Sequence, residues 1–270
     1  MAALQSIPAL HGVGVLVTRP ELQAMPLCRL LEAQGASTLR LPAVEIKPLG
    51  DRRALAAQLG DLEHFDVIIF SSANAVRFGV SFLDQRRGLT LAALGPATAR
   101  ALNQAGYRVA IHPEDSIDTE GLLKHPQLER VAGQRILMVK GGDGRELLRQ
   151  ELSQRGATVV IADVYERAPA NPSASALAQV HERFAAGAIH VVTATSLEVG
   201  RNLLKLAAGE RAPPELRNEF ERVHWLVPSE RVALGLRELG LKAPLLQAPS
   251  AEDQDLVTAL IRWRSSVSGA

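Results

Sequence analysis

The chain has 270 residues, which is long for one simple domain and natural for two domains of about 120–130 residues, each with its own core. Its 30 Lys and Arg residues offset 29 Asp and Glu residues, and the formal charge of +1 excludes a global field that would hold nucleic acid or an anionic membrane. The single cysteine, Cys28, excludes an intrachain disulfide and a cysteine cluster for zinc or an iron–sulfur centre, and the seven histidines lack metal-ligand spacing. We therefore expect no metal site and no nucleic-acid partner.

The N-terminal stretch MAALQSIPALHGVGVLVTRP has no basic start, and glycines interrupt its longest apolar run. Secretory signal peptides and membrane spans have a different pattern. We expect a cytoplasmic protein that does not associate with membranes.

The first predicted unit, residues 14–48, consists of a strand, a helix and a second extended segment. Apolar residues at helical spacing end at Gly35, which we expect to terminate the helix with a left-handed backbone. The extended segment TLRLPAVEI follows, and its Pro42 indicates a sheet edge or a connection.

This unit recurs farther along the chain. Residues 135–169 align with residues 14–48 without a gap, at a constant offset of 121, so that Gly35 matches Gly156. The pairing continues, because DVIIFSSANAV matches IHVVTATSLEV and LAALGPATARALNQAG matches WLVPSERVALGLRELG. This internal duplication of alternating strands and helices predicts an α/β fold with two doubly wound, parallel-sheet domains and roughly five strands from each copy.

The stretch KGGDGRELL, beginning at Lys140, places three glycines between a predicted strand and a predicted helix. A G-x-G-x-x-G phosphate loop would need another glycine at Leu147, and no G-x-x-x-x-G-K-[ST] pattern occurs in the chain. The corresponding stretch of the first copy, around TRPELQ, has no glycine. The repeat therefore requires a strand-to-helix turn here, with its backbone N–H donors, but no nucleotide loop.

Candidate ligand-binding residues follow the predicted strands, because open parallel sheets bind ligands outside the carboxyl ends of their strands. Most are hydroxyl residues, glycines or cations at predicted helix N-termini: Thr18, Arg19, Ser71, Ser72, Asn74, Gly95, Thr98, Lys140, Gly144, Thr195, Ser196 and Ser229. Ser, Thr and Asn are also preferred helix caps, so capping alone remains an alternative for each of them. Two such sets facing across a cleft would suit a ligand with many carboxylates or phosphates.

Conventional catalytic machinery is not visible in the sequence. No G-x-S-x-G elbow occurs, and Cys28 lies within a predicted helix, where we interpret it as a small buried hydrophobe. His190 and His224 fall in predicted strands and are interpreted as structural. Tyr165 stands where the first copy has Val44, which indicates either a function or an amphipathic tyrosine on an edge strand.

In this order and spacing, the motifs VLVTRP, FSSANAV, LGPATARAL, DTEGLL, KGGDGRELL with VYERAP, and PSERVA resemble the uroporphyrinogen-III synthase family over nearly the whole chain. The resemblance implies two flavodoxin-like domains joined by a two-stranded ladder of TLRLPAVEI and TVVIADVYE. It assigns residues 1–44 and 169–270 to one domain and residues 45–168 to the other. The repeat alone leaves two sequential domains equally open.

The resemblance also implies an activity, that of a lyase of heme and tetrapyrrole biosynthesis. Such an enzyme cyclises hydroxymethylbilane, with inversion of the last pyrrole ring and loss of water, to uroporphyrinogen III. No cofactor is implied, and we expect the chain to act as a monomer on this small-molecule substrate.

The family motifs carry over to particular residues. The family tyrosine falls on Tyr165, which would help the hydroxyl to leave or shield the cation. The binding motifs fall on Thr18 and Arg19 (T-R-P), on Ser71, Ser72 and Asn74 (F-T-S-x-N), and on Gly144 with Arg145 (G-G-R). Two motifs depart from the family: FSSAN has serine in place of the usual threonine, and TATSLEV stands where the family tends to have FTSPSSV.

Two other functions share this architecture. A cytoplasmic two-domain sensor would close on a small molecule without turnover. A two-domain glycosyltransferase would be expected to carry a nucleotide or metal signature, and none is visible.

Overall fold

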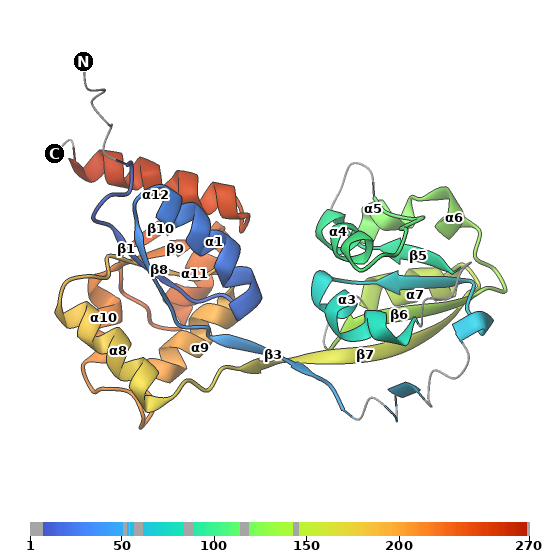
Figure 1. Cartoon of the computed structure of the whole chain (residues 1–270), viewed down its shortest axis with the longest axis horizontal. Coiled ribbons are helices and arrows are strands. Elements are labelled where there is room, and N and C mark those ends of the chain that lie inside the picture. The colour runs from blue at the N-terminus through green and yellow to red at the C-terminus, as the bar shows by residue number, and fades with distance from the viewer. Residues whose placement is uncertain are drawn as a thin grey trace, which may run out of the picture. The chain divides into compact units, whose positions relative to one another are not determined.

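The computed structural model describes residues 8–50, 53, 55–56, 62–83, 89–113, 119–142 and 146–268. Strands and helices alternate along most of these ranges (Figure 1). The strands are β1 (Gly14–Val17), β2 (Ser37–Arg40), β3 (Val44–Pro48), β4 (Val67–Phe70), β5 (Thr90–Ala93), β6 (Arg135–Gly141), β7 (Thr158–Pro169), β8 (Val191–Thr193), β9 (His224–Val227) and β10 (Leu245–Gln247).

The helices cover the faces of the sheets that these strands form. They are α1 (Glu21–Ala33), α3 (Ala73–Gly79), α4 (Pro96–Gln104), α5 (Thr119–Leu123), α6 (Pro126–Glu129), α7 (Glu146–Gln154), α8 (Ala174–Ala185), α9 (Leu197–Ala207), α10 (Leu216–Arg222), α11 (Glu230–Glu238) and α12 (Asp253–Ser268), with short 3-10 helices η1 (Leu62–His64) and η2 (Val80–Phe82). None of the helices within the described ranges is both long enough and apolar enough to cross a bilayer.

The chain forms two compact units. The first unit comprises Met1–Glu45 with Ala168–Ala270, and the second comprises Ile46–Arg167. Each unit contains a five-stranded sheet, in the order β10-β9-β8-β1-β2 in the first and β3-β7-β6-β4-β5 in the second. The first unit is therefore discontinuous, since its sheet joins two strands from the start of the chain to three from the end.

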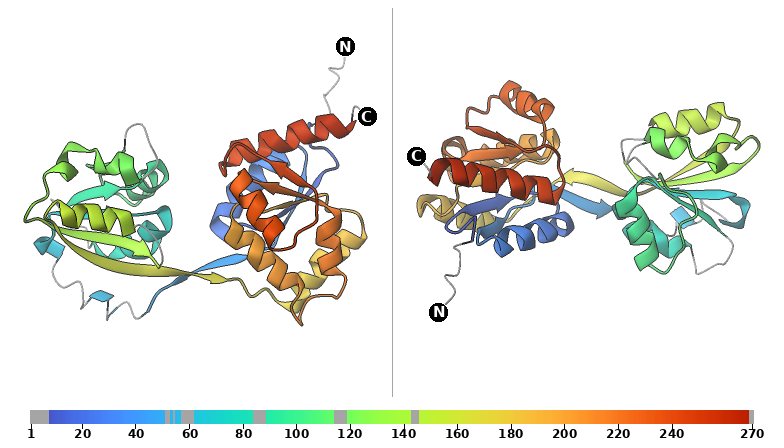
Figure 2. Two further views of the ribbon diagram at one scale, coloured as in Figure 1. Left: turned by 180° about the vertical axis from the view of Figure 1, so that it is seen from behind. Right: turned by 90° about the horizontal axis from the view of Figure 1, so that it is seen from above.

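Parallel pairing on both sides explains why the inner strands of the first unit, β1, β8 and β9, are largely apolar and buried. All four residues of β1 are buried, because both faces of a parallel sheet are covered. Val15 and Val17 face a cluster with Leu27 and Leu31 of α1 and Leu256 of α12. Figures 1 and 2 show α1 and α12 together on this side of the sheet.

The sheet of the second unit is also covered on both faces. Ile68 and Phe70 of β4 pack in one cluster with residues of α3 and α4, whereas Val67 and Ile69 pack in another with residues of α5, α6 and α7. This alternation follows the two-residue period of a strand. The sheet is thus the middle layer of three, and its carboxyl edge is left for the loops.

The predicted helix-terminating glycines are confirmed. Gly35 has φ +85° and Gly156 has φ +89°. In both repeats the next amide donates back to the helix, from Ala36 N to the carbonyl of Leu31 and from Ala157 N to that of Leu152, each at 3.1 Å. The same closing motif therefore ends the first helix of each repeat.

The segment TLRLPAVEI is divided between the two sheets, which corrects its assignment to a single ladder strand. Its first part, within β2, pairs in parallel with β1 at the edge of the first sheet. The chain leaves that edge at Pro42, which has no N–H to donate to a ladder, and β3 then lies beside β7. Ala170 N donates to the carbonyl of Ala43, and Leu49 N to that of Val164, both at 3.1 Å, as in an antiparallel pair.

Candidate active site

The second unit gathers several predicted residues at one edge of its sheet. Neighbouring strands β7, β6, β4 and β5 are parallel where they pair, so the loops after β4, β5 and β6 leave from the same edge. Tyr165 of β7 pairs with Gly141 at the end of β6, Ser71 follows β4 directly, and Gly95 lies just beyond β5.

A β-bulge in β7 determines the face of the sheet on which the side chain of Tyr165 lies. Lys140 pairs with Asp163, but the next residue, Gly141, pairs with Tyr165, so Val164 is an extra residue in β7. Val164 and Tyr165 consequently pack in the same buried cluster, although consecutive strand residues normally point to opposite faces. Bulges of this kind re-aim side chains next to active sites.

The ring of Tyr165 is held on several sides. The side chain is buried, with 8% of the residue exposed. Its ring centroid lies 5.9 Å from that of Phe78 on α3, and its hydroxyl oxygen lies 3.0 Å from Ser72 Oγ. The phenol oxygen therefore lies at the start of α3 rather than in the middle of the core.

Ser72 and Gly95 are confirmed as residues at which helices begin. Ser72 Oγ accepts a hydrogen bond from Ala75 N at 3.0 Å and caps α3, while Ser71 and Asn74 beside it are half-buried. Gly95 precedes α4 in extended conformation, with Pro96 at the first helical position. Thr98 is buried within α4 (4% exposed), so it contributes to packing.

Lys140 is already paired inside the protein. Its Nζ lies 3.1 Å from Asp163 Oδ1 and donates to the carbonyl of Gly142, and its side chain is 12% exposed. Lys140 thus holds the turn after β6 and does not present a free cation to a ligand. Gly144 and Arg145, which were predicted to bind ligand, lie outside the described residues.

In the first unit, Thr18 is fully buried at the end of β1. Its hydroxyl donates to the carbonyl of Thr193 in β8, and its amide donates to Thr193 Oγ1 at 3.2 Å. Thr18 therefore links β1 to β8. We predicted from the sequence that Thr18 binds a ligand, but its buried side chain is not placed to contact one.

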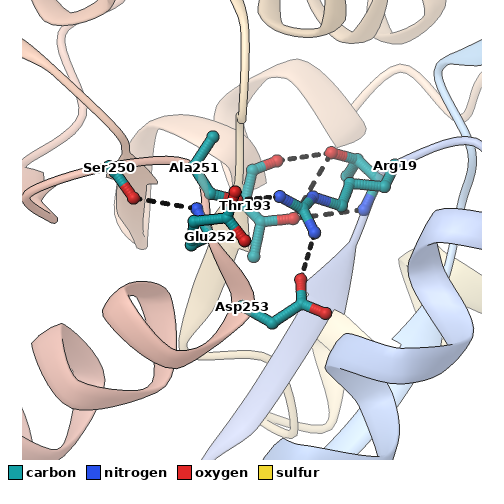
Figure 3. Close-up of polar contacts among 7 residues, drawn as sticks. Arg19, Thr193, Ser250, Ala251, Glu252 and Asp253 are labelled. Carbon is teal, nitrogen blue, oxygen red and sulfur yellow. Dashed lines mark hydrogen bonds and ion pairs between the residues drawn. The ribbon is translucent and has the colours of Figure 1, made fainter. Parts of the chain in front are cut away.

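Arg19 lies beside the start of α12 (Figure 3). Its guanidinium donates to Asp253 Oδ1 and to the carbonyl of Ala251, with 12% of the side chain exposed. These contacts join residues more than 200 positions apart. Arg19 thus ties the end of β1 to the N-terminus of α12, where the carboxylate of Asp253 also suits the helix dipole.

Ser196 and Ser229 begin α9 and α11, after the neighbouring strands β8 and β9. Ser196 Oγ accepts from Val199 N at 3.2 Å, and Ser229 Oγ accepts from Val232 N at 3.4 Å. Thr195 is half-buried next to Ser196. The first unit thus repeats the arrangement of capping serines seen at Ser72.

These capping serines are also able to bind an anion. A hydroxyl has one donor and two acceptor lone pairs, and the capping bond uses only a lone pair. The hydroxyl proton and the unpaired N–H groups of the first helical turn remain available to a carboxylate. Capping and ligand binding are therefore compatible at Ser72, Ser196 and Ser229.

An open pocket of about 630 Å³ lies elsewhere in the first unit, between α1, β2 and Gln179 of α8. Cys28 is in its wall, and burial raises the pKa of this thiol above its usual 9.0, so the thiol stays protonated at neutral pH. The prediction of a buried cysteine in a helix is confirmed. Among the residues that the structure describes, no group of three or more His, Cys, Asp and Glu side chains could hold a metal ion.

The two predicted structural histidines have structural partners. His190 Nδ1 accepts a hydrogen bond from Gly14 N at 2.9 Å, just before β8. His224 begins β9, its ring centroid lies 5.0 Å from that of Trp263, and burial lowers its pKa below 6.5.

Sequence reasoning missed Asp163 and Phe78 as partners of the candidate site. Asp163 pairs with Lys140, and Phe78 packs on Tyr165. A strict two-residue period would place Tyr165 on the face opposite Val164, and the residues of β7 themselves do not reveal the bulge at Val164. The adjacent glycine, Gly141, is the one readable signal, because glycine in a strand often accompanies a bulge or a close approach.

Comparison with known proteins shows which family this chain is similar to. A family model described as uroporphyrinogen-III synthase HemD matches residues 26–258. The uroporphyrinogen-III synthase of Escherichia coli strain K12 is 31% identical over 259 residues, covering 92% of this chain and 100% of the relative. That of Chlorobaculum parvum is 31% identical over 200 residues, covering 71% and 78% of the two chains.

Solved structures of similar proteins share the fold. Uroporphyrinogen-III synthetase from Helicobacter pylori has a TM-score of 0.58 at 15% identity, covering 93% of this chain and 99% of that one. A mutant uroporphyrinogen III synthase from Thermus thermophilus has a TM-score of 0.54 at 19% identity, covering 96% and 100%. At these identities the structural likeness concerns the fold alone.

Proposed function

The chain belongs to the uroporphyrinogen-III synthase family, and from this membership we propose that it converts hydroxymethylbilane to uroporphyrinogen III. The reaction closes a linear tetrapyrrole into a ring, with inversion of the last pyrrole ring and loss of water. The observation that carries the proposal is the family match over residues 26–258, which includes parts of both compact units.

We propose that orientation of the substrate is the main source of catalysis. Hydroxymethylbilane closes by itself to the unrotated isomer, so the protein must fold the chain and direct a reactive cation. The acetates and propionates along the substrate need hydrogen-bond donors at many points. The hydroxyls of Ser196 and Ser229, with the first-turn amides of the helices that Ser72, Ser196 and Ser229 cap, supply such donors.

Tyr165 is the proposed catalytic residue. The C–O bond of the hydroxymethyl group breaks with its electron pair on oxygen, and the oxygen takes the phenol proton and leaves as water. The carbon left behind is cationic, and the facing phenolate stabilises it. The pyrrole carbon that closes the ring later gives up a proton, which restores the phenol.

The overall reaction removes water without a change of oxidation state. It therefore needs no electron carrier, and the residues at the strand ends are proposed to hold the substrate without a cofactor.

We further propose that the two units are flavodoxin-like domains produced by internal duplication and joined by the β3–β7 ladder, with boundaries at residues 1–44, 45–168 and 169–270. In the first unit the strands from the β2 edge run β2-β1-β8-β9-β10, which is the 2-1-3-4-5 order of such folds. Gly35 and Gly156 both close a helix, and they are separated by the same offset as the other aligned residues of the repeat, which supports the duplication.

The alternative is a two-domain sensor that binds a small molecule without turnover. To test the two, purified protein is mixed with freshly generated hydroxymethylbilane without an added cofactor, and the oxidised products are separated into uroporphyrin isomers. Mainly isomer III supports the proposed reaction. Isomer I alone, at the spontaneous rate, contradicts it, and saturable binding with that outcome would favour the sensor.

A further inference from the structure

The hydroxyl of Ser72 makes two contacts that have different consequences. Its Oγ accepts the Ala75 amide proton at 3.0 Å and lies 3.0 Å from the phenol oxygen of Tyr165. A serine hydroxyl carries one proton, and the capping bond leaves that proton free to be donated. We infer that Ser72 positions Tyr165 for the reaction, by donating its proton to the phenol oxygen so that the phenol proton points to the leaving hydroxyl.

This inference rests on the proposed function and assigns Ser72 a different role from the one that its motif suggested. If Ser72 chiefly bound a substrate carboxylate, its loss would weaken substrate binding. If it orients the phenol, its loss slows the chemical step and leaves binding nearly intact.

The comparison between the two units singles out Ser72 among the capping serines. Ser196 and Ser229 make the same capping bond, but no tyrosine hydroxyl is hydrogen-bonded to either among the described contacts. The repeat position of Tyr165 is Val44 in the first copy. The serine–tyrosine pair is therefore present in one copy only and is not a requirement for capping a helix.

The surroundings of the ring restrict where the phenol oxygen can lie. A Cβ added at Gly141 would lie 2.3 Å from Tyr165 Cε2 and Cζ, so the ring rests directly on the glycine backbone. Phe78 flanks it at 5.9 Å between ring centroids. With the ring fixed by packing, the remaining freedom is rotation of the phenol proton, and Ser72 is the neighbour that sets it.

The test compares Ser72→Ala with Ser72→Thr, which keeps a hydroxyl that can both cap and donate. Ser173→Ala is the matched control for loss of a cap, because Ser173 Oγ accepts from Ala176 N at 3.2 Å on the exposed start of α8. We expect Ser72→Ala to lower kcat for isomer III about five- to tenfold with KM nearly unchanged. Ser72→Thr should recover most of the activity, and Ser173→Ala should have wild-type kinetics.

A second readout does not depend on turnover. The chain has two tyrosines, Tyr107 and Tyr165, so ring-fluorinated tyrosine gives two fluorine resonances that Tyr107→Phe assigns. Ser72→Ala should shift the Tyr165 resonance, whereas Ser173→Ala should leave it in place.

Two outcomes would overturn the inference. One is a raised KM at unchanged kcat in Ser72→Ala, which would make Ser72 a substrate ligand. Another is a Ser72→Ala substitution that lowers activity by the same factor in the Tyr165→Phe variant as in wild type. A residue that acts through the phenol should have no further effect once the phenol hydroxyl is gone. Wild-type protein that yields only isomer I would instead refute the proposed function, and the fluorine shift would still report whether the Ser72–Tyr165 bond exists.

Discussion

Replacing Gly141 by alanine tests whether the ring of Tyr165 is held where the structure places it. The added Cβ would lie 2.3 Å from Cε2 and Cζ of Tyr165 and 2.6 Å from Cδ2. Ordinary van der Waals contact begins near 3.4 Å, so the ring must retreat by about 1 Å. A shift of that size away from Ser72 would stretch the 3.0 Å hydrogen bond beyond its useful range.

The expected magnitude follows from three contributions. Overpacking a buried site costs about 1–3 kcal/mol, and losing a neutral hydrogen bond costs about 1 kcal/mol. Alanine also restricts the unfolded chain, which returns about 0.4–1 kcal/mol. We therefore expect Gly141→Ala to lower the free energy of unfolding by about 1–3 kcal/mol and to lower kcat with it.

Gly142 provides a matched control in the next position. A Cβ there meets nothing within 4 Å, and neither glycine has a left-handed backbone. Urea unfolding of the two variants should give a stability loss for Gly141→Ala and a small gain, up to about 1 kcal/mol, for Gly142→Ala. Equal stability of the two variants would refute the described packing of Tyr165 on Gly141.

Tyr165→Phe, which keeps the ring packing but removes the hydrogen bond with Ser72, should lower kcat for isomer III about a hundredfold and the free energy of unfolding by only about 1 kcal/mol, and full activity would remove Tyr165 from the mechanism. Arg19→Gln should cost about 1–3 kcal/mol in urea unfolding, because it breaks the bonds to Asp253 and Ala251, and an unchanged midpoint would contradict that role. Burial lowers the pKa of His224 below 6.5 in the folded state, so the unfolded chain takes up the proton first as the pH falls. The free energy of unfolding should therefore decrease below about pH 6.5, and His224→Phe should weaken that decrease relative to wild type in urea titrations at several pH values.

Much of the fold could be predicted because local chemistry decides it. Gly35 and Gly156 end their helices, as the change from helical spacing to glycine indicates, and the apolar runs around Leu16 and Leu137 become buried parallel strands. The predicted strand-to-helix turns hold for Ser72, Ser196 and Ser229, each of which caps a helix.

At the turns after β4 and β8, the sequence alignment of the two repeats differs by one residue from the match between the helix caps. It matched Ser72 with Thr195, whereas the capping residues are Ser72 and Ser196. The cap is the second residue after β4 but the third after β8, and both Thr195 and Ser196 carry a hydroxyl. Sequence pattern alone could not choose between two adjacent cap formers.

The contents of the candidate site were harder to predict, because tertiary contacts decide them. The hydroxyl of Thr18 is hydrogen-bonded to Thr193 of β8, and Arg19 is paired with the carboxylate of Asp253, more than 200 positions away. Lys140 is paired with Asp163 across a ladder whose bulge changes the register at the next residue. Each of these residues lies at the predicted strand end, but its partner could not be read from local sequence.

In the proposed function, this chain directs ring closure catalytically. The most direct measurement is the number of isomer III molecules formed per protein chain from freshly generated hydroxymethylbilane, with isomer I counted in the same samples. We expect many isomer III molecules per chain and an isomer III fraction that rises with protein concentration. An isomer ratio equal to that of the protein-free reaction at every concentration would contradict it.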